Sequence, residues 1–152
     1  MLKEREKCWL MSGHLPFSTR NRQKPVAECG KLLIGEPGCK LATKLDPWVV
    51  DKGYKVRAVE NIKDVFLTLQ DEKINVLVMD VCLPEEMGCE AISIIKSMYR
   101  NLPIIVTTDE NNPELESSVR QMGIFYYHVK SFGMDELILA ISNAMARSAR
   151  QE

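Results

Sequence analysis

The sequence alternates short apolar runs with segments of helical periodicity, and this alternation constrains the fold more than any other feature. The apolar runs read "KLLI" from Lys31, "YKVRAV" from Tyr54, "INVLVMD" from Ile74, "PIIVTT" from Pro103 and "IFYYHV" from Ile124. Short runs of this kind are typical of buried strands. Five strands that alternate with five helices predict a doubly wound α/β fold, in which a five-stranded parallel sheet carries helices on both faces in a three-layer sandwich.

The segments between these runs place apolar residues at the spacing of one helical face. The apolar positions are Leu41, Leu45, Trp48 and Val49, then Ile62, Val65, Phe66 and Leu69, then Ile92, Ile95 and Met98, and last Leu137, Ile138, Ile141, Ala144 and Met145. Pro47 lies within the first set, so we expect a kink or a late start there. The fourth helix is expected to begin at Asn112-Pro113, with Asn as its cap, and to end by Gly123.

The bulk composition bounds the class of protein. Of the 152 residues, 45% are hydrophobic and 27% charged, as in a globular chain. We expect an extension over residues 1–30, mobile or acting as a docking arm, and one domain over residues 31–150. The net charge of −1 offers no general attraction to nucleic acid, and no apolar stretch approaches the roughly 18 residues of a membrane helix. Neither nucleic acid nor membrane is therefore an expected partner.

The cysteines do not form a recognisable metal or disulfide pattern. Five of them occur at irregular spacing without a C-x-x-C pair, and the histidines His14 and His128 lie far apart. A zinc site is therefore not expected. Reduced thiols fit a cytoplasmic protein best. Cys82 and Cys89 flank the acidic site described next, and we expect both to be inert.

Polar residues gather where the predicted strands end. The residues are Glu36 after the first strand, Asp80 at the end of the third, Thr107 and Thr108 at the end of the fourth, and Lys130 after the fifth. Ligands of open parallel sheets bind outside the carboxyl ends of the strands, so we expect these side chains to form one site.

The chemistry of this edge suits a metal ion and a phosphoryl group. Two neighbouring carboxylates repel each other unless a cation lies between them, and Mg²⁺ prefers such oxygen ligands. A carboxylate beside Mg²⁺ can also attack a phosphoryl group as a nucleophile. Lys130 would then offset charge on the transferred oxygens, and Thr107 would donate a hydrogen bond to one of them.

Three stretches resemble the receiver domains of two-component response regulators. "VLVMDVCLPEEMG" resembles their phosphoacceptor segment, with an Asp, a Pro four residues on and a Gly eight residues on. "PIIVTT" resembles the receiver strand that ends in Thr or Ser. "GIFYYHVKSF" resembles the stretch with an aromatic residue three positions before the Lys and a Phe two positions after it. The resemblance runs from about Lys31 to Ala149 and implies the flavodoxin-like receiver fold.

The resemblance assigns a role to each matching residue. It makes Asp80 the acceptor of a phosphoryl group from a partner's phosphohistidine. Thr107 would reorient toward that group, and Lys130 would pair with it. Tyr127 takes the place of the aromatic switch residue, while Tyr126 points to the opposite face of the strand. His128 is expected to be a half-buried strand residue and not a phosphorelay histidine.

The stretch "KLLIGEPGCK" holds the acidic rim of the implied metal site. The resemblance makes Glu36, Asp80 and the backbone carbonyl of Cys82 the ligands of Mg²⁺. Receivers usually carry two adjacent acids after the first strand, whereas this chain has Gly35 followed by Glu36. A phosphate-binding loop would need Gly before Lys40 and Ser or Thr after it, and the sequence has neither.

Two further departures bear on phosphorylation. Ser131 follows Lys130 where receivers generally have Pro after a cis bond, and a cis bond to another residue costs on the order of 3 kcal/mol. We therefore expect a trans loop and a displaced Lys130. Thr108 replaces the usual Ala or Gly and would narrow the approach of a phosphodonor. With Gly35, these residues predict slow phosphorylation or a need for high Mg²⁺.

The resemblance implies a signalling function and not an enzyme. We expect a stand-alone receiver that takes phosphate from a histidine kinase or phosphotransfer protein and then changes its affinity for a downstream protein, by population shift. The family's usual output face corresponds to about residues 113–150, and a homodimer is possible. A degenerate receiver that binds partners independently of phosphate is the alternative. A flavodoxin-like enzyme is a weaker one, because the first turn lacks a loop rich in Ser and Thr.

Overall fold

A computed structural model of the chain describes residues 30–83 and 89–151 and contains a five-stranded parallel sheet. The strands are β1 (Lys31–Gly35), β2 (Lys55–Val59), β3 (Val76–Asp80), β4 (Ile104–Thr108) and β5 (Tyr126–Val129), in the spatial order β2-β1-β3-β4-β5. Each strand lies within one of the apolar runs of the sequence, except that β1 extends one residue further to Gly35, and every pairing is parallel. The predicted fold class is thus confirmed.

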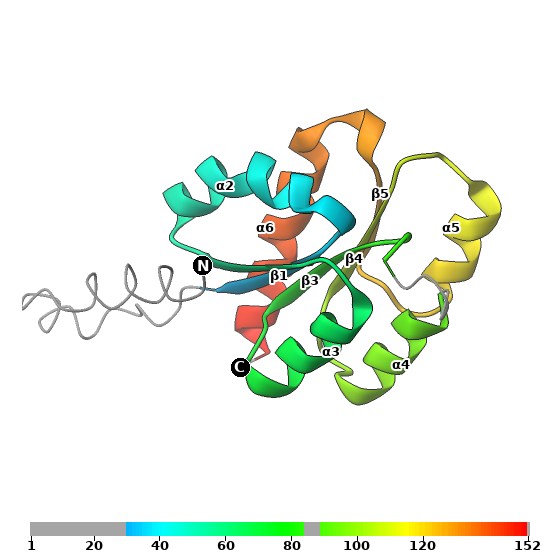
Figure 1. Cartoon of the computed structure of the whole chain (residues 1–152), viewed down its shortest axis with the longest axis horizontal. Coiled ribbons are helices and arrows are strands. Elements are labelled where there is room, and N and C mark those ends of the chain that lie inside the picture. Colours follow the sequence, from blue (N-terminus) through cyan, green and yellow to red (C-terminus); the bar gives the residue numbers. More distant parts are fainter. Residues whose placement is uncertain (1–29, 84–88, 152) are drawn as a thin grey trace, which may run out of the picture.

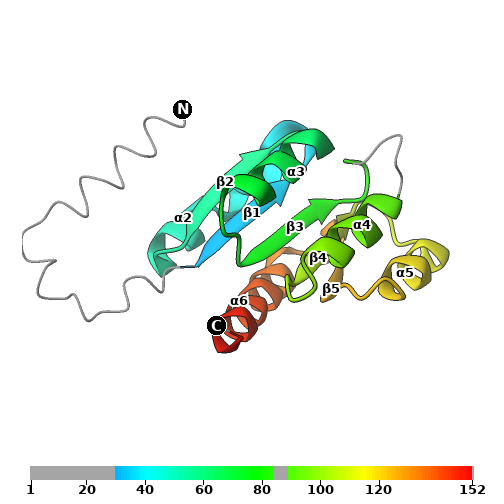
Figure 2. The ribbon, with the colours of Figure 1, turned by 90° about the horizontal axis from the view of Figure 1, so that it is seen from below.

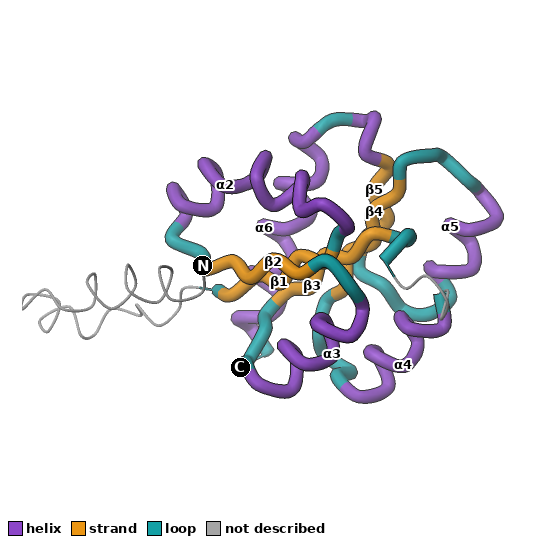
Figure 3. The backbone as a smooth tube through the Cα atoms, viewed as in Figure 1, coloured by secondary structure: helices purple, strands orange, loops and turns teal. Residues whose placement is uncertain are grey.

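Helices cover both faces of the sheet (Figure 1; Figure 3). On one face lie α2 (Lys40–Lys52) and α6 (Met134–Arg150), and on the other lie α3 (Ile62–Asp71), α4 (Glu90–Met98) and α5 (Pro113–Arg120). Figure 2 shows the molecule from the side of α3 and α4. The short helices η3 (Pro37–Cys39) and η5 (Lys130–Phe132) follow β1 and β5 directly.

The sheet separates two hydrophobic clusters because alternate strand residues point to opposite faces. The cluster beneath α3, α4 and α5 includes Leu33, Leu77 and Ile104, and the cluster beneath α2 and α6 includes Ile34, Val78 and Ile105. β1, β3 and β4 are thus covered on both sides, which explains their continuous apolar sequences. The layered core places the strand ends, and the residues that follow them, at one rigid edge.

Side-chain caps fix the starts of two helices. Asn61 Oδ1 accepts a hydrogen bond of 2.8 Å from the backbone N–H of Asp64 at the start of α3. Asn112 Oδ1 accepts one of 3.0 Å from Leu115 at the start of α5, as the sequence predicted. Gly123 adopts φ 86° in the turn that follows α5.

Two expectations differ from the structure, and one alternative is removed. Pro47 lies inside α2, which begins at Lys40, so the alternative of a late start at Pro47 is wrong. Met98 does not face inward: it is the last residue of α4 and is 51% exposed, because it lies beyond the stretch that packs on the sheet. His128 is fully buried rather than half-buried. The predicted extension over residues 1–30 lies, apart from Gly30, outside the described residues.

Candidate functional site

The carboxyl edge of the sheet brings together four of the five polar residues that the sequence singled out, whereas the Thr108 hydroxyl bonds the backbone of Glu110 instead. Glu36 follows β1, Asp80 ends β3 and Lys130 follows β5. Thr107 lies directly beside Asp80 in the register of β3 and β4. Because these strands are neighbours or near neighbours in one parallel sheet, their ends meet without any long connection, as the rule for open sheets requires.

Lys130 is the centre of the site. Its Nζ lies 2.6 Å from Asp80 Oδ2 and 2.7 Å from Glu36 Oε2. Burial alone lowers the pKa of Lys130, but its hydrogen bonds to the Asp80 and Glu36 carboxylates outweigh burial and raise the pKa above its ordinary value. The ammonium is therefore charged at any physiological pH, and it neutralises part of the charge of the two carboxylates.

The remaining carboxylate oxygens also have partners. Asp80 Oδ1 accepts a hydrogen bond of 2.8 Å from the backbone N–H of Cys82, and Thr107 Oγ1 donates to Asp80 Oδ2 at 3.3 Å. Glu36 Oε1 accepts a bond of 2.6 Å from the N–H of Leu41, in the first turn of α2. A carboxylate is favoured at this position by the partial positive charge of the helix start.

The donor set can be tested for the metal that the resemblance implies. Mg²⁺ is commonly held by one or two carboxylates, with water completing its shell, and Glu36 and Asp80 supply two. Cys82 lies in the turn after Asp80, so its carbonyl belongs to the same edge. No group of three His, Cys, Asp or Glu side chains in residues 30–83 and 89–151 is arranged to hold a metal. The residues therefore fit Mg²⁺ with few protein ligands and most of its shell supplied by water.

Asp109 is a site residue that the sequence reasoning missed. Its Oδ1 lies 3.5 Å from Lys130 Nζ, although the side chain is 74% exposed. It comes directly after Thr108 at the carboxyl end of β4, so the same edge rule could have found it. Asp109 adds a third carboxylate to the surroundings of one ammonium.

The structure shows what surrounds the three residues that depart from the receiver pattern, Gly35, Thr108 and Ser131. A β-carbon on Gly35 would lie 2.7 Å from Leu83 Cδ2, so a leucine occupies the space of a side chain there. Thr108 is buried, and its Oγ1 exchanges hydrogen bonds with the backbone of Glu110. No cis peptide occurs in the described parts of the chain, yet Lys130 reaches Asp80. The expected displacement of Lys130 before Ser131 is therefore wrong.

The two tyrosines of β5 point to opposite faces, as predicted. Tyr127 is buried against the α3, α4 and α5 face, and its hydroxyl has no hydrogen-bond partner among the residues that the structure describes. Burial raises the pKa of Tyr127, and the Thr108 side chain near its hydroxyl acts against this shift. Tyr126 lies toward α6, where its hydroxyl is 3.4 Å from Glu136 Oε1. Of the two tyrosines, Tyr127 is therefore the one whose hydroxyl lies in the hydrophobic core.

The cysteines beside the site are not activated. Partial burial and then the charge of Asp80 raise the pKa of Cys82, which is exposed. Burial also raises the pKa of Cys89. Because the thiolate is the reactive form, both residues are held in their less reactive state at neutral pH. This agrees with the expectation that they are inert.

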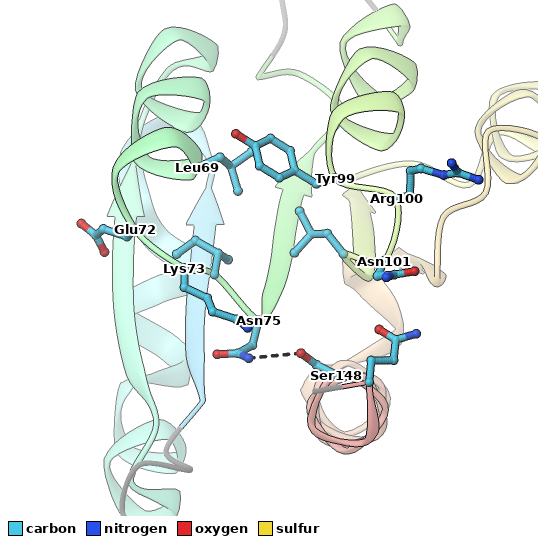
Figure 4. A pocket seen from close by; sticks show the side chains of 11 residues that line it. Leu69, Glu72, Lys73, Asn75, Tyr99, Arg100, Asn101 and Ser148 are labelled. Carbon is cyan, nitrogen blue, oxygen red and sulfur yellow. Dashed lines mark hydrogen bonds between the residues drawn. The ribbon is translucent and has the colours of Figure 1, made fainter.

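A surface cavity of about 410 Å³ lies at the opposite, amino edge of the sheet (Figure 4). Residues from the ends of α3, α4 and α6 line it, among them Glu72, Tyr99 and Ser148. Within it, Asn75 Nδ2 donates a hydrogen bond of 3.1 Å to Ser148 Oγ. None of the predicted site residues lines this cavity, so it is separate from the acidic edge.

Comparison with known proteins agrees with this fold. The model of the family described as "Response regulator receiver domain" matches residues 40–142. The DNA-binding transcriptional regulator NtrC of Proteus hauseri is 31% identical over 123 residues, which cover 81% of this chain and 26% of that protein. NtrC of Salmonella typhimurium is 26% identical and is covered to 24%. The chain thus spans about a quarter of the length of these curated relatives.

Solved structures share the fold. The receiver domain of a putative LuxO repressor protein from Vibrio parahaemolyticus has a TM-score of 0.73 at 20% identity, with 81% of this chain and 95% of that chain covered. A CheY-like receiver domain protein from Methanospirillum hungatei has a TM-score of 0.72 at 16% identity, with 82% and 99% covered. No helix in the described part of the chain is long and apolar enough to cross a membrane. The chain belongs to the response regulator receiver domain family.

Proposed function

We propose that this receiver domain accepts a phosphoryl group on Asp80 from the phosphohistidine of a histidine kinase or phosphotransfer protein. The observation that carries the proposal is the position of Lys130, whose Nζ lies within 2.7 Å of both Glu36 and Asp80. A buried carboxylate at a strand end, held beside a permanently charged ammonium, is suited to receive a group whose oxygens carry negative charge.

The transfer follows from the groups at this edge. A carboxylate oxygen of Asp80 attacks phosphorus, and the P–N bond of the phosphohistidine breaks. Its electron pair goes to the imidazole nitrogen, which is protonated from solvent, and Asp80 becomes an acyl phosphate. Lys130 offsets the charge on the phosphoryl oxygens, and the Thr107 hydroxyl exchanges its bond to Asp80 for one to a phosphoryl oxygen. Mg²⁺ held by Glu36, Asp80 and the Cys82 carbonyl would supply further positive charge for these oxygens.

The signal would leave through the surface formed by about residues 113–150. Thr107 lies on β4, and Tyr127 lies on the adjacent β5 with a buried hydroxyl that lacks a partner. A movement of Thr107 toward the phosphoryl group would alter the end of β4, along which Tyr127 lies on β5. A buried polar group without a partner is costly, so a second arrangement of Tyr127 has an energetic basis. The phosphorylated state would then bind a downstream protein, or a second copy, with altered affinity.

A second candidate is a module that binds partners independently of phosphate. It is favoured by the ammonium of Lys130, which already bridges both carboxylates, and by the leucine that fills the space beside Gly35. In that case Glu36, Asp80 and Lys130 form a structural ion cluster, and the partner surface does not change.

Intact mass after incubation with acetyl phosphate and Mg²⁺ separates the two candidates. We expect one phosphoryl adduct on the wild type and none on Asp80→Asn, which keeps the size of the side chain but removes the nucleophile. Slow formation with a requirement for high Mg²⁺ is expected, because Gly35 leaves Glu36 without a second acidic residue beside it, and Lys130 already pairs with both Glu36 and Asp80. Absence of the adduct at any Mg²⁺ concentration would favour the phosphate-independent module.

A further inference from the structure

Gly35 stands at an unusual place for a glycine. It is the last residue of β1, a strand that lies between β2 and β3 inside the sheet. Glycine in a strand loses more conformational freedom on folding than other residues and contributes no side-chain packing. Gly35 does not adopt the left-handed conformation that would require glycine. The reason for it must therefore be a neighbour that needs the space.

That neighbour is Leu83. A β-carbon on residue 35 would lie 2.7 Å from Leu83 Cδ2, which is too short for carbon atoms in contact, and 3.1 Å from Val65 Cγ2, which is tighter than most such contacts. Leu83 is only 3% exposed and belongs to the cluster beneath α3, α4 and α5. The side chain of Leu83 is thus seated in a notch that exists because residue 35 is glycine.

Leu83 also closes the turn that carries the phosphoacceptor. Its N–H donates a hydrogen bond of 3.0 Å to the carbonyl of Asp80. Inside the turn, the N–H of Cys82 donates to Asp80 Oδ1 at 2.8 Å. At the start of the turn, the N–H of Val81 donates to the carbonyl of Thr107 at 2.9 Å. The turn is therefore tied to β4 at one end and to the notch at Gly35 at the other.

We propose that Leu83 is a positioning residue for Asp80. Seated over Gly35, it holds the turn Asp80–Leu83 so that the Cys82 N–H points at Asp80 Oδ1, which fixes the rotation of the carboxylate about its Cβ–Cγ bond. This inference rests on the proposed function, because a fixed carboxylate matters most where Asp80 is a nucleophile. Correct orientation of a reacting group contributes strongly to rate.

The test compares Leu83→Ala with Leu69→Ala. Leu69, on α3, is buried in the same cluster but lines the cavity at the amino edge, far from the turn. Both variants lose a buried leucine side chain, so both lower the melting temperature. The first readout is hydrogen exchange of the Cys82 amide by NMR, which needs no phosphodonor. The second is the rate of adduct formation with acetyl phosphate and Mg²⁺.

The proposal expects a difference between the two variants that stability does not explain. In Leu83→Ala, the Cys82 amide exchanges about tenfold faster than in Leu69→Ala, and the adduct forms about tenfold more slowly. Leu83→Met, which nearly conserves side-chain volume, restores both properties to within about threefold of the wild type. Equal Cys82 exchange in Leu83→Ala and Leu69→Ala would overturn the proposal.

The notch itself is tested by Gly35→Ala and by the double variant Gly35→Ala/Leu83→Ala. In the wild-type background the new methyl group displaces Leu83 and accelerates Cys82 exchange. In the Leu83→Ala background the conflict with residue 83 is already removed, so the same substitution changes Cys82 exchange by less than about twofold, although the close approach to Val65 remains. Equal effects in the two backgrounds would contradict the pairing of Gly35 with Leu83.

These outcomes are distinguishable from failure of the proposed function. If the wild type forms no adduct, Asp80 is not a phosphoacceptor under these conditions, whatever the exchange data show. If the wild type forms the adduct but Cys82 exchange and adduct rate are the same in Leu83→Ala and Leu69→Ala, the function stands and the role of Leu83 is rejected.

Discussion

The two edges of the sheet both hold ion clusters, but with opposite charge balance. At the carboxyl edge one cation, Lys130, serves two carboxylates, Glu36 and Asp80, within 2.7 Å. At the amino edge two cations, Lys31 and Arg57, serve the single carboxylate of Glu72. One edge therefore retains negative charge that a further cation can balance, whereas the other is saturated.

Burial differs in the same direction. The Asp80 side chain is 4% exposed and that of Lys130 is 26% exposed. At the amino edge, the side chains of Lys31 and Arg57 are 32% and 28% exposed. Burying several charges of one sign close together costs free energy of folding. Buried groups of this kind are often found at functional sites. The comparison shows that the ion cluster at the carboxyl edge has an excess of carboxylates, whereas the Glu72 cluster at the amino edge has an excess of cations.

The largest expected effect comes from removing the cation of the carboxyl edge. Lys130→Met leaves Glu36 and Asp80 close together without compensation, and we expect it to lower the free energy of unfolding at pH 7 by about 2–4 kcal/mol, somewhat less than for a fully buried pair. Urea denaturation without divalent ions measures this. Added Mg²⁺ is expected to recover part of the loss. A variant as stable as the wild type would break the comparison.

A smaller loss is expected at the amino edge. Glu72→Gln removes the charge that Lys31 and Arg57 share, but both cations retain access to water. We expect a decrease of about 1 kcal/mol in the free energy of unfolding, by the same denaturation experiment, and no response to Mg²⁺. Stabilisation of this variant by Mg²⁺ equal to that of Lys130→Met would erase the distinction between the edges.

The pH dependence of the free energy of unfolding tests the burial of His128 on β5. Burial lowers the pKa of His128 below its ordinary value of 6.5, with Glu136 acting against the shift and Lys130 adding to it. The unfolded state then binds more protons than the folded state in acid, so the stabilising contribution is present above pH 6.5 and is lost as the pH falls through the lowered pKa. Urea denaturation of His128→Gln is expected to show a flatter dependence below pH 6.5. An unchanged slope would assign the acid sensitivity to other groups.

The smallest effect is expected at the rim of the carboxyl edge. Asp109 lies 3.5 Å from Lys130 but is largely exposed, so solvent screens the pair. Asp109→Asn is expected to change the free energy of unfolding by less than about 0.5 kcal/mol. A loss as large as that of Glu72→Gln would show that the third carboxylate is part of the buried cluster.

Much of this architecture could be predicted from the sequence. The apolar runs located all five strands, because strands covered on both faces must be continuously apolar. The edge rule then placed Glu36, Asp80, Thr107 and Lys130 together, since parallel strands end at one edge. The predictions that failed depend on tertiary contacts, which the periodicity of the sequence does not reveal.

The misses have particular physical causes. Lys130 was expected to be displaced, but a long flexible side chain reaches Asp80 from a trans loop. Asp109 was overlooked although it directly follows Thr108 at the end of β4, because the edge rule was applied only to the residues that end the other strands and to Thr107 and Thr108. The packing of Leu83 over Gly35 joins residues far apart in the chain, and no local pattern indicates it.

The most direct test of the central claim is the rate of phosphoryl-adduct formation by intact mass, with acetyl phosphate and Mg²⁺, in the wild type and in one variant from each edge. We expect the adduct on the wild type, an unchanged rate in Glu72→Gln and no adduct in Asp80→Asn. An adduct that persists in Asp80→Asn, or its absence from the wild type at every Mg²⁺ concentration, would contradict the assignment of Asp80 as the phosphoacceptor.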